Sequence, residues 1–233
     1  MTSQPAGTTP VEAVIFDRDG TILDFYDMFH RFIADLHDAA GQAPPAREEI
    51  LGYAYWQSII DGTLRIGEAV VNDRITDVPL RYMRHGSLYP GTAQAIRELA
   101  ARGVRVGIVS SWVGTEATVA FLRAESLLRH VAVVVTHDDC GEDAGHAHRR
   151  SAAIKRRVLE IAIARLGVRA SRVVVVGDSP DDVEAGSALG ARTAAVLTGN
   201  GTTLRPAIEA LGPRWILPGA ADVVAVVDRE RAA

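Results

Sequence analysis

The chain has 233 residues, 48% of them hydrophobic, and a formal net charge of −4 at pH 7. This length and composition predict a globular protein, built as one large domain or as a core domain with an insertion. The net charge gives no general attraction to nucleic acid or to anionic membranes, so any anion-binding site must come from a local cluster of residues.

The first ten residues, MTSQPAGTTP, are polar and lack the apolar core of a signal peptide. No later run approaches the roughly 20 apolar residues of a membrane-spanning helix. The one cysteine, Cys140, cannot form an internal disulfide, which agrees with a reducing compartment. We therefore expect a cytoplasmic protein.

Five short apolar runs, rich in β-branched residues, recur along the chain and cover residues 11–16, 104–109, 131–135, 172–176 and 193–197. Runs this apolar, separated by helical patterns, predict parallel strands buried on both faces. The segments 92–102 and 152–166 each end before a glycine and predict crossover helices. The predicted fold is therefore α/β, a doubly wound parallel sheet, with a last short strand and helix within residues 215–227.

An insertion interrupts this alternation, because about 85 residues separate the first strand from the second, far more than a simple crossover needs. Residues 25–41 and 47–62 carry helical patterns, and the prolines at 44 and 45 separate them. We expect a helical domain over residues 22–88, inserted into a core formed by residues 1–21 and 89–233.

Polar residues follow several predicted strands where they end, and in an open parallel sheet the ligand site lies outside these carboxyl ends. They are Asp17 and Asp19 after the first strand, Ser110 and Ser111 after the second, and Asp178 and Asp182 after the fourth. Carboxylates that converge in this way repel one another unless a cation lies among them. Oxygen ligands of this kind predict Mg²⁺ as the cofactor.

Four motifs follow one another in this order: DRDGT at 17–21, a strand ending at Ser110, a helix that carries Lys155, and GDSPDD at 177–182. Together they resemble the four motifs of the haloacid dehalogenase superfamily of phosphohydrolases. The phrases YPGT (89–92) and AVLTGNGT (195–202) resemble its phosphoglycolate phosphatase-like branch. The resemblance implies a Rossmann-like core, with the inserted helices as the cap domain of that superfamily.

The resemblance also implies a role for each residue of the first motif. Asp17 would attack phosphorus and form an aspartyl-phosphate, which splits one difficult displacement into two. Asp19 would protonate the leaving oxygen and then deprotonate the hydrolytic water. Gly20 lets the backbone pass close to the substrate, and Thr21 can fix the turn.

The remaining motifs would hold the phosphoryl group and the metal. Mg²⁺ would be bound by Asp17, the carbonyl of Asp19 and Asp178, with Asp182 acting through water or by orienting Lys155. Ser110 would donate a hydrogen bond to a phosphoryl oxygen, and Lys155 would neutralise the charge shared by the nucleophile and the phosphoryl group. For Ser111 two roles are open, that of a turn residue and that of a second contact to the phosphate.

Lys155 is the only lysine in the chain, and it lacks the proline that many relatives place after this lysine. Ser151 is a plausible N-cap of its helix, which puts Lys155 in the first turn, where an anion nearby would offset the macrodipole. The neighbouring Arg156 can instead pair with Glu160 on the solvent face. We prefer Lys155 to Arg149 or Arg150 as the catalytic cation.

Residues of the insertion are expected to contact the substrate beyond its phosphate. The candidates for lining a pocket over the phosphate are Phe25, Tyr26, Met28, His30, Arg31 and Trp56. Most aromatics at helical spacing are core residues. His30 and Arg31 are the preferred specificity residues because they follow the first motif closely.

The loop at residues 137–148, HDDCGEDAGHAH, gathers His137, Cys140, His146 and His148 and raises the alternative of a zinc site. Its spacing matches no closed zinc module, and its acidic residues and glycines are typical of a surface loop. We favour the surface loop.

The leading hypothesis is an Mg²⁺-dependent phosphatase acting on a small phosphorylated metabolite, with no nucleic-acid or membrane partner, as a monomer or homodimer. Haloacid dehalogenases lack the second aspartate of the first motif, so Asp19 argues against carbon–halogen cleavage. Phosphonatases use a cap lysine, and residues 22–88 contain none. A sugar-phosphate mutase and a catalytically idle binding protein remain as alternatives, and phosphoglycolate is a substrate suggested by the resemblance alone.

Overall fold

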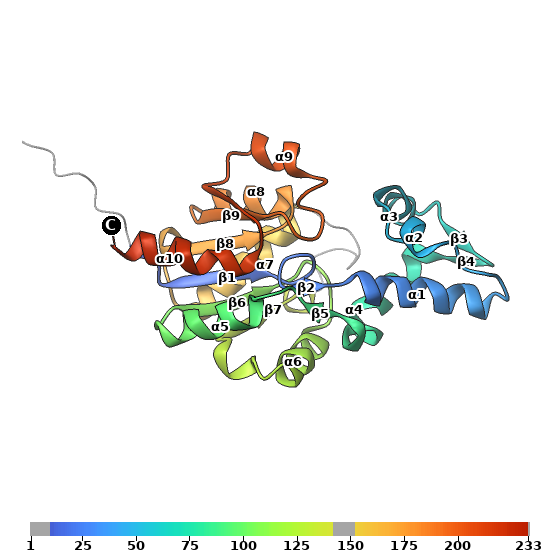
Figure 1. Cartoon of the computed structure of the whole chain (residues 1–233), viewed down its shortest axis with the longest axis horizontal. Coiled ribbons are helices and arrows are strands. Elements are labelled where there is room, and N and C mark those ends of the chain that lie inside the picture. The colour runs from blue at the N-terminus through green and yellow to red at the C-terminus, as the bar shows by residue number, and fades with distance from the viewer. Residues whose placement is uncertain (1–9, 142–151, 233) are drawn as a thin grey trace, which may run out of the picture.

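The computed structural model describes residues 10–141 and 152–232. A six-stranded sheet in the order β10-β9-β8-β1-β6-β7 forms its centre, and all neighbouring strands are parallel (Figure 1). The strands are β1 (Ala13–Asp17), β6 (Arg105–Val109), β7 (Val133–Val135), β8 (Val173–Gly177), β9 (Arg192–Val196) and β10 (Trp215–Leu217). The prediction of a doubly wound parallel sheet is confirmed.

Helices cover both faces of this sheet. The helices α5 (Thr92–Ala101), α6 (Thr115–Ala124) and α10 (Val223–Ala232) share one apolar cluster with one face of the sheet, and α7 (Ala152–Leu166) and α8 (Pro180–Ala188) pack on the other. Side chains of β1 alternate between them: Val14 and Phe16 join the first cluster, and Ala13 and Ile15 join the second. This two-sided burial explains the continuous apolar runs. A shorter helix, α9 (Arg205–Ala210), lies between β9 and β10 in the chain.

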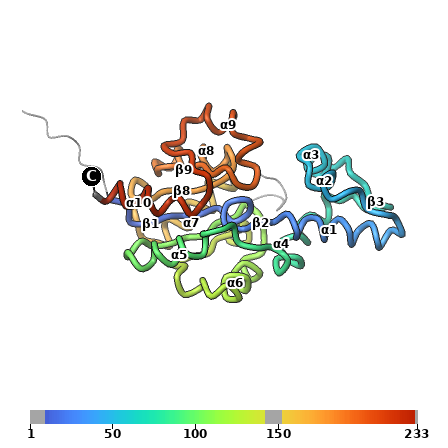
Figure 2. Tube along the Cα trace, viewed as in Figure 1, coloured from blue at the N-terminus to red at the C-terminus, as the bar shows by residue number. Residues whose placement is uncertain are grey.

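The insertion leaves and rejoins the core through two short antiparallel strands, β2 (Leu23–Asp24) and β5 (Ser87–Leu88). Between them lie α1 (Tyr26–Ala39), α2 (Arg47–Ile50), α3 (Tyr53–Ile60), the hairpin β3 (Arg65–Ile66) and β4 (Ala69–Val70), and α4 (Asp77–Arg81). Figures 1 and 2 show this helical unit at one end of the molecule, opposite the C-terminus. In the Cα trace of Figure 2, the helical unit is formed by one continuous segment of the chain.

The helical pattern at residues 47–62 was predicted as one element, but it forms two helices. Gly52 lies between α2 and α3 in an extended conformation, with φ −69° and ψ 144°, which ends the first helix and caps the second. Glycine has little preference for the helical region, so the break falls there. The turn sets the direction of α3 and therefore the side chains that it presents.

The helical unit shares an apolar core with the sheet. Met28, Phe29 and Phe32 of α1 are buried at the helical spacing and belong to the same cluster as Phe16 of β1. Trp56 of α3 contacts Trp112, which follows β6, with ring centroids 5.7 Å apart. The helical unit is therefore packed against the core and does not hang from β2 and β5 alone.

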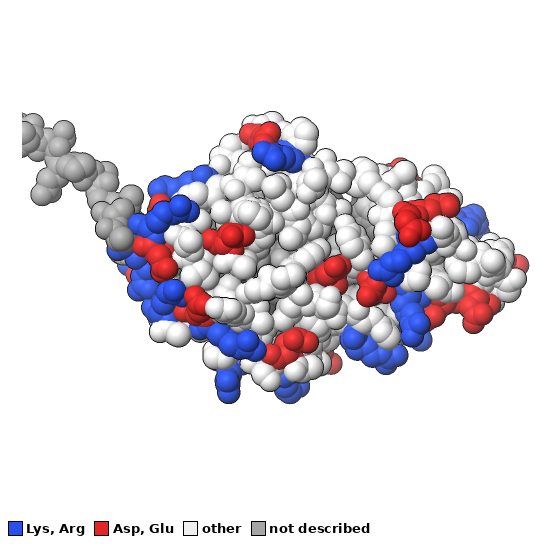
Figure 3. All heavy atoms as spheres, in the orientation of Figure 1, with Lys and Arg blue, Asp and Glu red and all other residues white. Residues whose placement is uncertain are grey.

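The surface carries charges of both signs. On the face shown in Figure 3, basic and acidic side chains are interspersed, and no large area has a single sign. This distribution agrees with the absence of a general attraction to polyanions that was inferred from net charge. Among the described helices, none combines the length and the apolar character needed to cross a membrane.

Candidate active site

Strand register brings the predicted site residues together. Asp17 is the last residue of β1 and lies opposite Val109 of β6, so the next residue of that chain segment, Ser110, lies beside it. On the other side, Phe16 lies opposite Val176, which places the end of β8 and Asp178 next to the same point. The convergence follows from parallel pairing, because carboxyl ends of neighbouring strands meet at one edge.

The loop after β1 is closed by its own backbone. The carbonyl of Arg18 accepts hydrogen bonds from the amides of Ile22 and Leu23, at 3.1 and 2.9 Å, and the amide of Gly20 donates to the carbonyl of Leu23. Gly20 has φ +82°, and a Cβ there would lie 2.2 Å from Oδ2 of Asp178. Only glycine therefore permits both this conformation and this approach.

A second loop, residues 198–201, supports the first. Oγ1 of Thr198 donates a hydrogen bond of 2.7 Å to the carbonyl of Gly20, and the amide of Asn200 donates one of 2.7 Å to Oδ2 of Asp178. Gly199 packs against the backbone of Gly20, and its amide donates to the hydroxyl of Tyr89 at 3.2 Å. The segments YPGT and TGNG therefore meet at the loop after β1 and help to fix Asp178.

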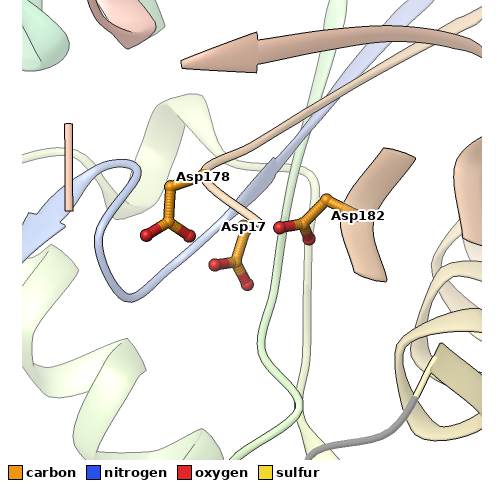
Figure 4. A group of neighbouring side chains, drawn as sticks. All are labelled: Asp17, Asp178 and Asp182. Carbon is orange, nitrogen blue, oxygen red and sulfur yellow. The ribbon is translucent and has the colours of Figure 1, made fainter. Parts of the chain in front are cut away.

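Asp17, Asp178 and Asp182 form a cluster of buried carboxylates, in which one oxygen of each lies within 4.8 Å of the others (Figure 4). The carboxylates come from the ends of β1 and β8 and from α8, and they point toward one another. Nζ of Lys155, from α7, lies 2.5 Å from Oδ1 of Asp17 and 2.8 Å from Oδ1 of Asp182. If all three carboxylates are ionised, the one ammonium leaves two negative charges uncompensated within this group.

Burial and charge act together on these groups. Burial raises the pKa of Asp17 to about 8; Lys155 opposes this shift, and the charges of Asp182, Asp178 and Asp19 add to it. Burial alone would lower the pKa of Lys155, but the carboxylates of Asp17 and Asp182 outweigh it and raise that pKa. A divalent cation among the carboxylates would favour their ionised form, so the donor set fits Mg²⁺.

Asp182 is held by the start of its own helix. Its Oδ2 accepts hydrogen bonds from the amide and the hydroxyl of Ser179, at 3.1 and 2.6 Å, in a capping box of α8. Its Oδ1 faces Lys155. Asp182 also occupies the space beside Gly177, where a Cβ would lie 2.1 Å from its Cγ. Asp182 therefore lies within reach of Lys155, and its role, orienting Lys155 or acting on the metal through water, stays a prediction.

Asp19 lies in a different environment from Asp17. Its carboxylate accepts hydrogen bonds from Nε of Arg18, at 3.1 Å to Oδ1 and 3.0 Å to Oδ2, and from the hydroxyl of Ser110, at 2.9 Å to Oδ2. Ser110 was predicted to donate to a phosphoryl oxygen, and here it donates to Asp19. Arg18 was not predicted as part of the site. A charged residue between two aspartates at a strand end was the signal that could have indicated it.

A cavity of about 300 Å³ lies over these residues, between the core and the helical unit. The core lines it with Asp17, Asp19, Ser110, Ser111, Trp112, Lys155, Asp178, Ser179, Pro180, Asp181, Asn200 and Leu204. From the helical unit, α3 lines it with Tyr53, Trp56, Gln57 and Ile60. Phe25 and Tyr26 line a smaller neighbouring cavity of about 50 Å³, also bounded by Tyr53 and Trp56.

Several predicted substrate-binding residues do not line the main cavity. His30 and Arg31 lie on α1, and Arg31 is exposed, whereas α3 supplies the lining residues of the helical unit. Gly20 and Thr21 shape the loop below the cavity, where Thr21 is fully buried. Met28 is a core residue. The pairing of Arg156 with Glu160 at 3.0 Å on an exposed face is confirmed.

Parts of the alternative predictions lie outside the described residues. These are Arg149 and Arg150, the predicted N-cap Ser151, and His146 and His148 of the zinc alternative. Within the described residues of that loop, His137 is buried and Cys140 half-buried.

Comparison with known proteins gives consistent matches. A family model described as haloacid dehalogenase-like hydrolase matches residues 11–190. The chain is 28% identical over 222 residues to a phosphoglycolate phosphatase of Synechococcus elongatus, covering 93% of this chain and 97% of that protein. It is also 28% identical over 206 residues to an N-acetylmuramic acid 6-phosphate phosphatase of Pseudomonas aeruginosa, covering 81% and 83%.

Among solved structures, the chain resembles a haloacid dehalogenase-like family hydrolase from Streptococcus pneumoniae. The TM-score is 0.69, with 16% identity, and the match covers 93% of this chain and 98% of that one. This likeness concerns the fold of the sheet, its helices and the inserted unit.

Proposed function

The chain belongs to the haloacid dehalogenase-like hydrolase family, and we propose that it is an Mg²⁺-dependent phosphatase that hydrolyses a small phosphorylated metabolite through an aspartyl-phosphate. The observation that carries this proposal is the buried cluster of Asp17, Asp178 and Asp182 beside Lys155. Such a group fits a site that binds a cation and a phosphoryl group together. The relatives named as phosphatases agree with this reaction class.

In the first step, a carboxylate oxygen of Asp17 forms a bond to phosphorus, and the bond from phosphorus to the leaving oxygen breaks. Asp19 gives a proton to the leaving oxygen. In the second step Asp19 takes a proton from water, the water oxygen bonds to phosphorus, and the carboxylate of Asp17 is released. The short loop after β1 holds both aspartates, which suits one acid–base group acting in both steps.

The other site residues hold charge. Lys155 stays protonated between Asp17 and Asp182 and would neutralise negative charge on the nucleophile and the phosphoryl oxygens. The carboxylates of Asp17 and Asp178 and the carbonyl of Asp19 would hold Mg²⁺, which supplies further neutralisation of the phosphoryl group when bound. Ser111 lines the cavity and could donate its hydroxyl to a phosphoryl oxygen.

The inserted residues 22–88 are proposed as a cap domain that determines the substrate. Within this segment, α3 lines the main cavity with aromatic, amide and aliphatic side chains. A cavity of about 300 Å³ suits a small metabolite. Flat apolar faces such as those of Trp56 and Trp112 suit a sugar ring, so sugar phosphates are proposed as first candidates, with phosphoglycolate as a second.

The test is phosphate release from a panel of phosphorylated metabolites, including sugar phosphates and phosphoglycolate, with and without Mg²⁺. We expect Asp17→Asn to abolish release, whereas Asp27→Asn, at an exposed position of α1, keeps it. Full activity of Asp17→Asn would contradict the assignment of the nucleophile. If a β-sugar monophosphate with a bisphosphate primer gives an isomer and no free phosphate, the enzyme is a mutase.

A further inference from the structure

Arg18 is the largest fully buried side chain of the described residues, with 1% of its surface exposed. A buried guanidinium is costly unless an opposite charge and hydrogen-bond acceptors surround it. The reaction proposed above gives Arg18 no role, since the two flanking aspartates carry the chemistry. Its retention in the interior, directly between the proposed nucleophile and the proposed acid–base group, therefore needs an explanation.

The guanidinium of Arg18 makes more contacts with one carboxylate oxygen of Asp19 than with the other. Oδ2 accepts from Nε of Arg18 at 3.0 Å and from the hydroxyl of Ser110 at 2.9 Å, and Nη2 of Arg18 lies 2.9 Å away. Among the residues that the structure describes, Oδ1 accepts one side-chain hydrogen bond, the shared one from Nε at 3.1 Å. Because Asp19 lines the cavity, Oδ1 is the oxygen left to carry a proton to or from a bound molecule.

The other end of the same guanidinium is fixed to the core. Nη1 donates a hydrogen bond of 2.7 Å to Oγ1 of Thr118 on α6, and one of 3.3 Å to the carbonyl of Val113. The hydroxyl of Thr118 in turn donates to the carbonyl of Gly114 at 2.8 Å, so it is oriented to accept from Arg18. Arg18 therefore connects the carboxylate of Asp19 to the first turn of α6.

We propose that Arg18 is a positioning residue, which holds Asp19 by Oδ2 so that Oδ1 faces the reacting oxygen. The inference rests on the proposed phosphatase function and deepens it. The guanidinium of arginine stays protonated in proteins, so Arg18 does not act as the acid itself. Its planar fork can hold a carboxylate in one orientation, which a flexible ammonium does less well.

The role predicts an effect that depends on the leaving group. Phenyl phosphate and p-nitrophenyl phosphate share a ring, but phenolate is a poorer leaving group because its conjugate acid has a pKa of about 10, and the nitro group lowers that pKa. Departure of phenolate therefore depends more on a proton from Asp19. If Asp19 is misplaced, hydrolysis of phenyl phosphate should slow much more than hydrolysis of p-nitrophenyl phosphate.

The experiment measures kcat/KM for both substrates with Mg²⁺ in the full chain. We expect Arg18→Met to lower kcat/KM for phenyl phosphate by about 10²-fold and for p-nitrophenyl phosphate by less than about 10-fold. In an Asp19→Asn background, Arg18→Met should add no further loss, because it acts through Asp19. Thr118→Val removes the anchor of Nη1, together with the hydrogen bond from Thr118 to the carbonyl of Gly114, and should give a smaller loss of the same pattern.

Arg192→Met is the matched control, since Arg192 forms a largely buried ion pair with Glu230 at 2.7 Å, at the opposite end of β9 from the site. It should leave the ratio between the two substrates unchanged. Equal losses on both substrates in Arg18→Met and Thr118→Val, or additive losses with Asp19→Asn, would overturn the inference. If the unmodified protein releases phosphate from neither of these substrates and from no member of the metabolite panel, the proposed function itself fails, before Arg18 is tested.

Discussion

The floor and the roof of the cavity differ in chemistry and in how they are held. The floor is built around charged residues, Asp17 and Asp178 at strand ends and Lys155 on α7, and all three are buried and bonded to neighbouring elements. The roof consists of uncharged side chains of α3, of which Tyr53 is 44% exposed. A rigid charged floor suits one reaction, whereas an exposed uncharged roof can change with the substrate.

The largest effect that separates the two regions is expected from Lys155→Met. The variant removes the positive charge between Asp17 and Asp182 and leaves their repulsion, so we expect kcat/KM to fall by about 10²- to 10³-fold on every substrate of the panel. Steady-state phosphate release measures this. Arg156→Met, one residue along on the exposed face of α7, should keep nearly full activity; a substrate-selective loss in Lys155→Met would contradict its place in the floor.

The geometry of the floor is tested by Gly20→Ala. The added Cβ would meet Asp178, and the backbone has φ +82°, so we expect at least about a tenfold loss of kcat/KM and a free energy of unfolding lowered by more than about 1 kcal/mol. Chemical denaturation and activity at several Mg²⁺ concentrations measure the two losses.

Gly103→Ala provides the control for backbone strain alone. Gly103 also has a positive φ, of +73°, but no atom lies within 4 Å of an added Cβ. We expect the free energy of unfolding of Gly103→Ala to fall by about 1 kcal/mol and its activity to equal that of the unmodified protein. Equal activity of both variants would show that the close approach of Gly20 to Asp178 is not needed.

The roof is tested by Trp56→Ala. Because Trp56 lines the cavity with an aromatic side chain, we expect KM for ring-bearing substrates to rise by about tenfold, with a much smaller change in kcat. A small acyl phosphate such as acetyl phosphate should be hydrolysed as before. Trp215→Ala, on β10, serves as the control. A loss of kcat on all substrates would contradict this prediction, because it would show that Trp56 supports the reaction itself and not substrate binding.

A smaller effect is expected from pH on the metal-free protein. The pKa of Asp17 is raised to about 8, so between about pH 4 and pH 8 the folded chain holds a proton there that the unfolded chain releases. The free energy of unfolding should therefore fall as pH rises through this window. The raised pKa of Lys155 adds nothing here, since its amine is protonated in both states below about pH 10.

Thermal unfolding at pH 6 and pH 8 measures this dependence. We expect a lower Tm at pH 8 without metal, and a larger stabilisation by Mg²⁺ at pH 8 than at pH 6, because the cation competes with the proton. Asp17→Asn should remove the pH dependence. An identical Tm at the two pH values, with and without Mg²⁺, would contradict the charge imbalance in the floor.

The floor was largely predictable, and the roof was not. Asp17, Ser110 and Asp178 were identified because parallel strands bring their carboxyl ends to one edge, whatever the rest of the fold does. Lys155 was identified from the order of the motifs and from its place in the first turn of a helix. His30 and Arg31 were preferred because they follow the first motif closely, but they do not line the cavity, because nearness in sequence does not determine which helix faces it. The lining residues of the helical unit come from α3, which begins after the break at Gly52.

By itself the sequence determined the reaction class, since residue types and their order at strand ends depend on local pattern and on a general rule of sheet topology. Only the tertiary structure distinguished the partners of the two aspartates of DRDGT: Lys155 for Asp17, and Arg18 with Ser110 for Asp19. Contacts of this kind depend on side-chain direction and on anchors such as Thr118, about 100 residues away in the chain. No local pattern specifies them, because packing between distant elements sets which acceptor a buried donor meets.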